Sequence, residues 1–174
     1  MAFFPVDRRT RPDASGPRNL ECGTRLYTAG EDGVAWRVRR GVMRLDSPQP
    51  NGERFASLAI AGDIVGCETM LFGAYTFTAT ALTQCELHPW PEGEAAVSGD
   101  SLLASLATAQ QRAAEIVALR GGQAADRVIA LVRLLTDNAG RVVLPTRQDI
   151  ADITDLRFET ISRIIKGLER ARVL

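Results

Sequence analysis

Three polar side chains with complementary hydrogen-bonding chemistry lie close together near the carboxyl end of the chain: Glu159, Ser162 and Arg163. An arginine can donate two parallel hydrogen bonds to guanine O6 and N7, a glutamate can accept from cytosine N4, and a serine can bond to several base edges. If this stretch is helical, all three side chains occupy outward positions. The set is typical of residues that read the edges of base pairs in duplex DNA.

Two short helices joined by a tight turn are expected around these residues. Thr146 is a good N-cap and Asp149, three residues later, can complete a capping box, so the first helix is predicted to run through Thr154. The turn covers 155–157 and the second helix covers 158–169. Apolar residues at helical spacing form the predicted buried face of the second helix: Ile161, Ile164, Ile165 and Leu168. This is the pattern of a helix-turn-helix, whose second helix enters the major groove.

Further polar residues are placed to bond phosphates, which sets the register of a protein on DNA rather than its sequence preference. They are Thr146, Arg147, Gln148, Arg157, Thr160 and Lys166. The whole chain carries 21 basic and 21 acidic residues, so any DNA-binding surface must be local. Residues 141–174 hold seven basic and five acidic residues, a modest excess. Two ordinary surface helices with solvated charges would show the same helical spacing, so periodicity alone leaves that alternative open.

The first half of the chain reads as short strands, with turn residues between them. Alternating or β-branched stretches at 34–39, 42–45, 55–60 and 77–82 are strand candidates, and the turn chemistry is concentrated at 30–33 and 47–52. Several short strands at this spacing predict a sandwich or barrel over residues 20–90.

A change to helical period follows at 99–120. Five apolar residues in a 4-3-4-3 spacing form one stripe that predicts a dimer interface: Leu102, Leu106, Ala109, Ala113 and Ile116. Leu103 and Val117 widen the stripe. An amphipathic helix that only covers the strand domain is the alternative, because three heptads are the minimum for a coiled coil. Gly121 and Gly122 then interrupt the helix and make a plausible hinge. A further helix is predicted from Gln123, closed by Asn138 and Gly140.

The stretches TRQDIADI at 146–153 and ETISRIIKGLE at 159–169 resemble the helix-turn-helix signature of the CRP/FNR regulators. A weaker resemblance to the effector jelly roll of that family runs through 20–32, 40–45 and 62–66. The resemblance implies an α+β fold: an N-terminal tail (1–19), a cyclic-nucleotide-binding-like β jelly roll (20–90), a long dimerisation helix (99–120) and a helix-turn-helix domain (121–174). It also implies a homodimer that meets promoter DNA and RNA polymerase.

The resemblance implies particular roles in recognition. Glu159, Ser162 and Arg163 match the three base readers of the FNR/FixK-like subgroup, which implies TTGAT-like half-sites in an inverted repeat. Asp155 stands where the family usually has glycine, because the backbone there favours positive φ, which aspartate tolerates. The sequence stops at Leu174, where the family continues into a two-stranded wing, so we expect either that the wing is missing or that the chain is truncated. A missing wing would weaken binding and make its dependence on salt shallower.

The sensor end departs from the family pattern. Where cyclic-nucleotide binders place a glutamate and then an Arg-Ser pair, this chain has Cys67 and then Tyr75 and Thr76, so we expect no cAMP binding. An iron-sulfur cluster is not expected either, because the three cysteines are widely separated and a cluster needs four thiolates. His88 could be an axial haem ligand, but a single histidine is more often a packing residue.

The effector or signal therefore stays unknown. Buried thiols are the simplest expectation for Cys22, Cys67 and Cys85, and oxidation of Cys67 or Cys85 is a further possibility.

We predict a cytoplasmic protein without a membrane span and without enzymatic activity. The N-terminus lacks the apolar run of a secretion signal, and no stretch of 18 apolar residues occurs. No phosphate loop and no catalytic constellation is recognisable. The favoured function is a dimeric DNA-binding regulator. The alternative is a ligand-sensing or protein-interaction module with a vestigial helix-turn-helix.

Overall fold

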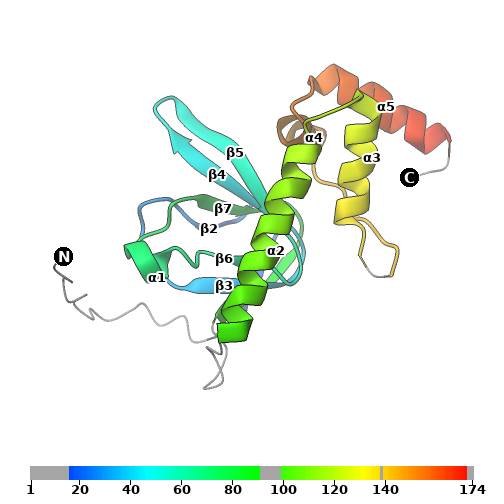
Figure 1. Cartoon of the computed structure of the whole chain (residues 1–174). Helices are drawn as coiled ribbons and strands as arrows, with labels where there is room; N and C mark the ends of the chain where they lie inside the picture. Colours follow the sequence, from blue (N-terminus) through cyan, green and yellow to red (C-terminus); the bar gives the residue numbers. More distant parts are fainter. Residues whose placement is uncertain (1–15, 91–98, 138, 172–174) are drawn as a thin grey trace.

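A computed structural model describes residues 16–90, 99–137 and 139–171. The amino-terminal part forms a β-roll, the long helix α2 (Gly99–Ala118) runs along it, and three helices gather at one end of α2 (Figure 1). These are α3 (Ala124–Leu135), α4 (Arg147–Thr154) and α5 (Phe158–Arg170). The predicted α+β fold of a jelly roll, a long helix and a helix-turn-helix is confirmed.

The roll consists of two four-stranded antiparallel sheets, with strand orders β1-β8-β3-β6 and β2-β7-β4-β5. The short helix α1 (Thr69–Phe72) follows β6. Apolar residues from both sheets, among them Val38, Met43 and Leu87, are fully buried in one core of the roll. The strand bounds are β1 (Arg18–Leu20), β2 (Arg25–Tyr27), β3 (Ala35–Arg40), β4 (Met43–Gln49), β5 (Gly52–Ala59), β6 (Ile64–Val65), β7 (Thr78–Ala81) and β8 (Cys85–Trp90).

The hairpin of β4 and β5 corrects one expectation. The predicted turn at 47–52 is mostly strand, because β4 continues through Ser47 and Pro48 to Gln49, and β5 begins at Gly52. Proline is tolerated there because β7 pairs with β4 only over Met43–Asp46, so one edge of β4 is free beside Pro48. The first strand also begins at Arg18, inside the predicted tail.

The apolar residues of helix α2 lie on two sides, one packed in the core and one exposed. Ile116 is only 5% exposed and packs in a core cluster with Leu119, Phe55 and Leu58, so its prediction as a dimer-interface residue is wrong. The adjacent Val117 is 73% exposed instead. Leu106, Ala109 and Ala113 are also exposed, on the same side of the helix as Val117. The side chain of Leu102 lies outside the described residues.

Helix α3 ends at Leu135, earlier than predicted. The chain turns there because the Asp137 carboxylate accepts hydrogen bonds from the backbone N–H groups of Ala139 and Arg141, at 2.9 and 2.8 Å. Gly140 adopts a φ of 74° within this turn. Asn138, the other predicted end signal, lies outside the described residues. Gly122, in the predicted hinge, has a φ of 77°.

The three carboxyl-terminal helices share a core with the roll. Val128, Leu131, Ile153 and Ile161 pack in one cluster with Phe55 and Leu58 of β5. The helix-turn-helix is thereby seated against the β4–β5 hairpin rather than tethered through the hinge alone. In the described part of the chain, no helix has the length and apolar character needed to cross a membrane.

Candidate nucleic-acid interface

Thr146 caps the amino end of α4 as the sequence predicts, but the return bond to Asp149 comes from the Thr146 hydroxyl rather than from its backbone N–H. Thr146 has an extended backbone, and its hydroxyl oxygen accepts a hydrogen bond from the Asp149 N–H at 3.2 Å. The same hydroxyl donates to Asp149 Oδ2 at 2.6 Å. This reciprocal pair satisfies one of the free N–H groups at the start of the helix and fixes where the helix begins.

The turn between α4 and α5 depends on Asp155. This residue has φ 54° and ψ 46°, the left-handed conformation expected at this position, and is the one described non-glycine residue with positive φ. Leu156 N–H donates to Ala151 C=O at 3.0 Å across the turn. The chain therefore leaves α4 abruptly and enters α5 at Phe158, which sets the angle between the two helices.

Helix α5 is strongly amphipathic. Ile161 and Ile165 are buried, and Ile164 and Leu168 are partly buried, so the predicted inward face is confirmed. On the other side, the helix presents a set of exposed polar side chains that we call the recognition face: Glu159, Arg163 and Lys166.

Ser162 does not join the recognition face in this structure. Its hydroxyl oxygen is buried and has no hydrogen-bond partner among the described residues. Thr160, predicted to bond phosphate, is half-buried, whereas Arg157 before α5 is exposed. Of the three predicted base readers, the structure thus brings two to the surface together.

The remaining predicted phosphate contacts lie on the first turn of α4. Thr146 and Gln148 are exposed and Arg147 is half-buried. The Gln148 side-chain amide donates to Asp152 Oδ1 at 2.9 Å, one turn further along the helix. These residues flank the amino end of α4, where free backbone N–H groups favour an anion.

Two arginines that the sequence did not single out hold the carboxyl end of α4. Arg120, just after α2, donates to the backbone oxygens of Ile153 at 3.3 Å and Asp152 at 3.2 Å. Arg127 of α3 donates to the oxygen of Thr154 at 3.3 Å. Cationic donors at this end satisfy the last carbonyl groups and complement the helix dipole. No local sequence signal marks them, because donor and acceptor lie far apart along the chain.

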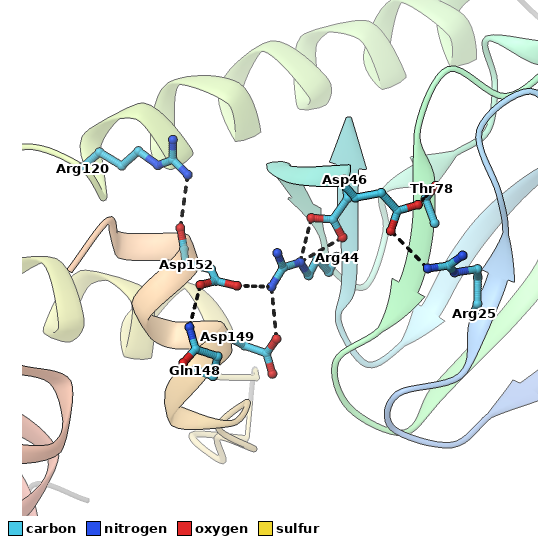
Figure 2. Close-up of polar contacts among 9 residues, drawn as sticks. Arg25, Arg44, Asp46, Thr78, Arg120, Gln148, Asp149 and Asp152 are labelled. Carbon is cyan, nitrogen blue, oxygen red and sulfur yellow. Dashed lines mark hydrogen bonds and ion pairs between the residues drawn. The ribbon is translucent and has the colours of Figure 1, made fainter. Parts of the chain in front are cut away.

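A third arginine, Arg44 of β4, reaches α4 from the sensor sheet. Figure 2 shows its guanidinium between Asp46 on the sheet and Asp149 and Asp152 on the helix. Nε donates to both oxygens of Asp46 at 2.8 and 2.9 Å, and Nη1 donates to Asp149 at 3.2 Å and Asp152 at 2.9 Å. Burial raises the pKa of Asp46, and the hydrogen bonds from Arg44 oppose that effect.

The space between sheet and helix holds a pocket of about 260 Å³. Arg44 and Asp46 line it from the sheet, Cys22 from the loop before β2, and Thr146 and Asp149 from α4. The amino end of α4 thus borders a gap between the two units of the chain.

The buried core of the roll includes the aromatic side chains of Tyr27, Trp36 and Tyr75. The Tyr75 hydroxyl donates to Val34 C=O at 2.7 Å, and both Tyr27 and Tyr75 are buried. A Cβ at Gly66 would lie 2.6 Å from Tyr75 Cε1, so the ring packs directly on that backbone. An aromatic ring therefore stands where the family resemblance implies a cationic contact to a cyclic phosphate.

The thiols and the histidine were the other sensor candidates. Cys85 is buried as expected, but Cys22 and Cys67 are exposed, so the expectation of three buried cysteines is wrong. Burial raises the pKa of Cys85, and partial desolvation together with the charge of Glu68 raises the pKa of Cys67. Both shifts reduce the thiolate fraction. His88 Nε2 lies 3.0 Å from Glu86 Oε1.

A β-roll, a long connecting helix and a carboxyl-terminal helix-turn-helix together define a class of proteins, the two-domain transcription regulators. No protein-family model matches the chain. The nitrogen fixation regulation protein FixK of Bradyrhizobium diazoefficiens is 33% identical over 152 residues, which cover 78% of this chain and 63% of that protein. FixK of Rhizobium meliloti is 28% identical over 170 residues, covering 92% of this chain and 80% of that protein.

A solved structure has the same fold. A CRP-family transcriptional regulator from Thermus thermophilus superposes with a TM-score of 0.71 at 24% identity, covering 88% of this chain and 85% of that one. The chain is similar to the transcription regulators of the CRP/FNR family. Its relatives are regulation proteins rather than enzymes, in agreement with the prediction of a non-enzymatic protein.

Proposed function

We propose that the chain is a sequence-specific DNA-binding transcription regulator that binds an inverted repeat as a homodimer. The observation that carries the proposal is the recognition face of α5, on which Glu159 and Arg163 are exposed while Ile161 and Ile165 anchor the opposite side. An arginine and a glutamate one turn apart suit guanine and cytosine edges in neighbouring base pairs. The FNR-type residues at these positions favour TTGAT-like half-sites.

The homodimer is supported by the outward side of α2. Leu106 is 57% exposed and Val117 is 73% exposed, with Ala109 and Ala113 exposed between them. Four apolar residues on one helix face are costly to leave in water, and small alanines let two helices approach closely. Two-fold symmetry about such an interface would place two recognition helices on one side of the dimer, as a palindromic operator requires. Contact with RNA polymerase belongs to the same proposal.

The signal that the roll receives is not a cyclic nucleotide in this proposal. Tyr75 occupies the roll interior, and its position lacks the cation that would neutralise a cyclic phosphate. The scattered cysteines also do not suit an iron-sulfur cluster, and His88 is already beside Glu86. Isothermal titration calorimetry with cAMP tests this part: no heat of binding is expected, and micromolar affinity would contradict it.

A gel-shift titration with a TTGAT-N4-ATCAA duplex tests the DNA-binding function. The wild-type chain is expected to bind this duplex more tightly than a scrambled one. Arg163→Ala should reduce that preference by about 1–3 kcal/mol, because a bidentate contact to guanine is lost. Arg133→Ala, which removes an exposed arginine from α3 instead, is the matched control and should bind as wild type does. Absence of binding at low salt would instead favour a vestigial helix-turn-helix.

A further inference from the structure

Helix α4 is attached to the rest of the chain at both of its ends. Arg120 and Arg127 hold the carbonyl groups of its last turn from the α2–α3 side. Arg44 holds the side chains of Asp149 and Asp152 from the sensor sheet (Figure 2). The two attachments differ in origin, because the first comes from the hinge region and the second from strand β4.

The attachment through Arg44 is shielded from water on the sheet side and more open on the helix side, where the Asp149 and Asp152 side chains are 23% and 36% exposed. The Arg44 side chain is 15% exposed, and that of its strand partner Asp46 is 8% exposed. In the described part of the chain, the ion pairs give Asp46, Asp149 and Asp152 only this one cationic partner. Removing the guanidinium would therefore leave three carboxylates facing one another across the boundary between sheet and helix, at a cost larger than that of losing a surface ion pair.

The hinge alone gives α4 little orientation. Gly121 and Gly122 join α2 to α3, and Gly122 has a φ of 77°, so this link has the conformational freedom of glycine. The apolar core shared with Phe55 and Leu58 seats the helix-turn-helix on β5. A directional polar contact away from the hinge adds to this packing by restricting the angle between the two units. Arg44 supplies a polar contact of this kind, and it leaves the recognition face of α5 exposed.

We propose that Arg44 is a positioning residue for DNA reading: it holds the helix-turn-helix at a fixed angle to the sensor sheet and thereby fixes the separation of the two recognition helices in the dimer. The proposal rests on the proposed function, since a dimer reads two half-sites about one helical turn, or roughly 34 Å, apart. Any change in the sensor sheet that moves β4 would reach α4 through the same guanidinium.

Hydrogen–deuterium exchange of the full chain without DNA tests the attachment directly. In Arg44→Gln, backbone amides at 146–157 are expected to exchange about tenfold faster than in wild type, a typical size for coupling between two sites. Arg25→Gln is the matched control, because it removes an arginine from the same sheet whose partner Glu53 is also on that sheet. It should leave exchange at 146–157 unchanged. Equal exchange in wild type and Arg44→Gln would overturn the proposal.

A second variant covers the case in which Arg44→Gln does not fold. Asp152→Asn removes charge only from the helix side and leaves the Arg44–Asp46 pair in place. It should also speed exchange at 146–157, by less than Arg44→Gln because Asp149 still binds Arg44. Unchanged exchange in this variant would count against the proposal.

A series of duplexes with the half-sites moved apart by single base pairs separates positioning from folding. Wild type should prefer one spacing, whereas Arg44→Gln should lose most of that preference and still bind a single half-site within about twofold. Arg44→Lys keeps the charge and should restore part of the preference. A retained preference in Arg44→Gln would overturn the role of Arg44. If wild type binds no duplex at all, the proposed function fails, and the exchange comparison alone decides whether Arg44 holds the helix.

Discussion

Tyr27 and Tyr75 stack face to face in the interior of the roll, with ring centroids 3.6 Å apart and planes 4° apart. Burial and nearby acidic charge raise the pKa of the Tyr27 phenol well above its usual range, so it stays neutral. The pair links β2 to the loop before β7 and packs on glycine backbone. The two rings therefore form part of the buried core of the roll.

Replacing Tyr75 should destabilise the roll. Tyr75→Ala is expected to lower the free energy of unfolding by about 3–5 kcal/mol, the range for removing a large buried aromatic ring. Tyr75→Phe keeps the ring and loses only the hydrogen bond to Val34, so it should cost about 1 kcal/mol. Urea denaturation followed by circular dichroism measures both, and equal losses in the two variants would contradict the packing role of the ring.

Ile116 and Val117 are neighbours in sequence with opposite expected roles. Ile116→Ala should lower the free energy of unfolding by about 2–5 kcal/mol, because it opens a cavity in the shared core. Val117→Glu should instead shift sedimentation toward monomer, since it places a charge in the proposed dimer interface. A Val117→Glu protein that sediments as wild type does would show that this side of α2 is not the interface.

Asp155 carries backbone strain in the turn between α4 and α5. Asp155→Gly should raise the free energy of unfolding by about 0.5–1 kcal/mol, because glycine adopts this left-handed conformation without a steric penalty. Asp155→Ala should lower it by about 1 kcal/mol. Thermal unfolding measures the stability of wild type, Asp155→Gly and Asp155→Ala. If Asp155→Ala were more stable than Asp155→Gly, the explanation by backbone strain would be wrong.

Lys166 is expected to contribute to affinity without contributing to specificity. Lys166→Ala should weaken binding to matched and scrambled duplexes by similar factors and reduce the slope of log affinity against log salt by about one. Arg163→Ala should change the ratio between the two duplexes instead. If Lys166→Ala altered that ratio, its assignment to phosphate rather than to bases would be wrong.

Asp137 should make the turn after α3 sensitive to acid. Hydrogen bonds from the backbone N–H groups of Arg141 and Ala139 lower its pKa, so its contribution to stability is present above the unfolded pKa of about 4 and is lost as the pH falls through the folded value. Asp137→Asn removes this titration. As the pH is lowered from about 6 to 2, the midpoint temperature of unfolding should therefore decrease less steeply for Asp137→Asn than for wild type. If the two proteins showed parallel curves of midpoint temperature against pH, the titration of Asp137 would not contribute to the acid sensitivity.

The elements that could be predicted from sequence are those with local causes. The N-cap at Thr146, the turn at Asp155 and the inward face of α5 each follow from a few adjacent residues, and the structure contains all three. The strands of the roll were predicted only in part. The sequence predicts a turn at Pro48, but this residue lies in β4. A proline fits there because β7 pairs with β4 only over Met43–Asp46, which the sequence does not show.

The errors and omissions have distant causes. Ile116 fits the outward stripe by spacing, yet it packs with Phe55 and Leu58 of β5, which lie far earlier in the chain. Ser162 has the chemistry of a base reader, but packing turns its hydroxyl inward. Arg44, Arg120 and Arg127 act on partners that no local pattern pairs with them. Sequence periodicity describes one helix at a time, whereas these outcomes depend on which surfaces meet.

The shared core of the β4–β5 hairpin and the three carboxyl-terminal helices has a consequence for modular rearrangement of such proteins. Phe55 and Leu58 of the roll are buried together with Ile153 and Ile161 of the helix-turn-helix. A chimera cut at the glycine hinge would separate these residues and expose apolar surface on both fragments. A chimera that replaces the roll but keeps the helix-turn-helix would also need to keep the β4–β5 hairpin. The segment that can be transferred intact is therefore larger than the helix-turn-helix.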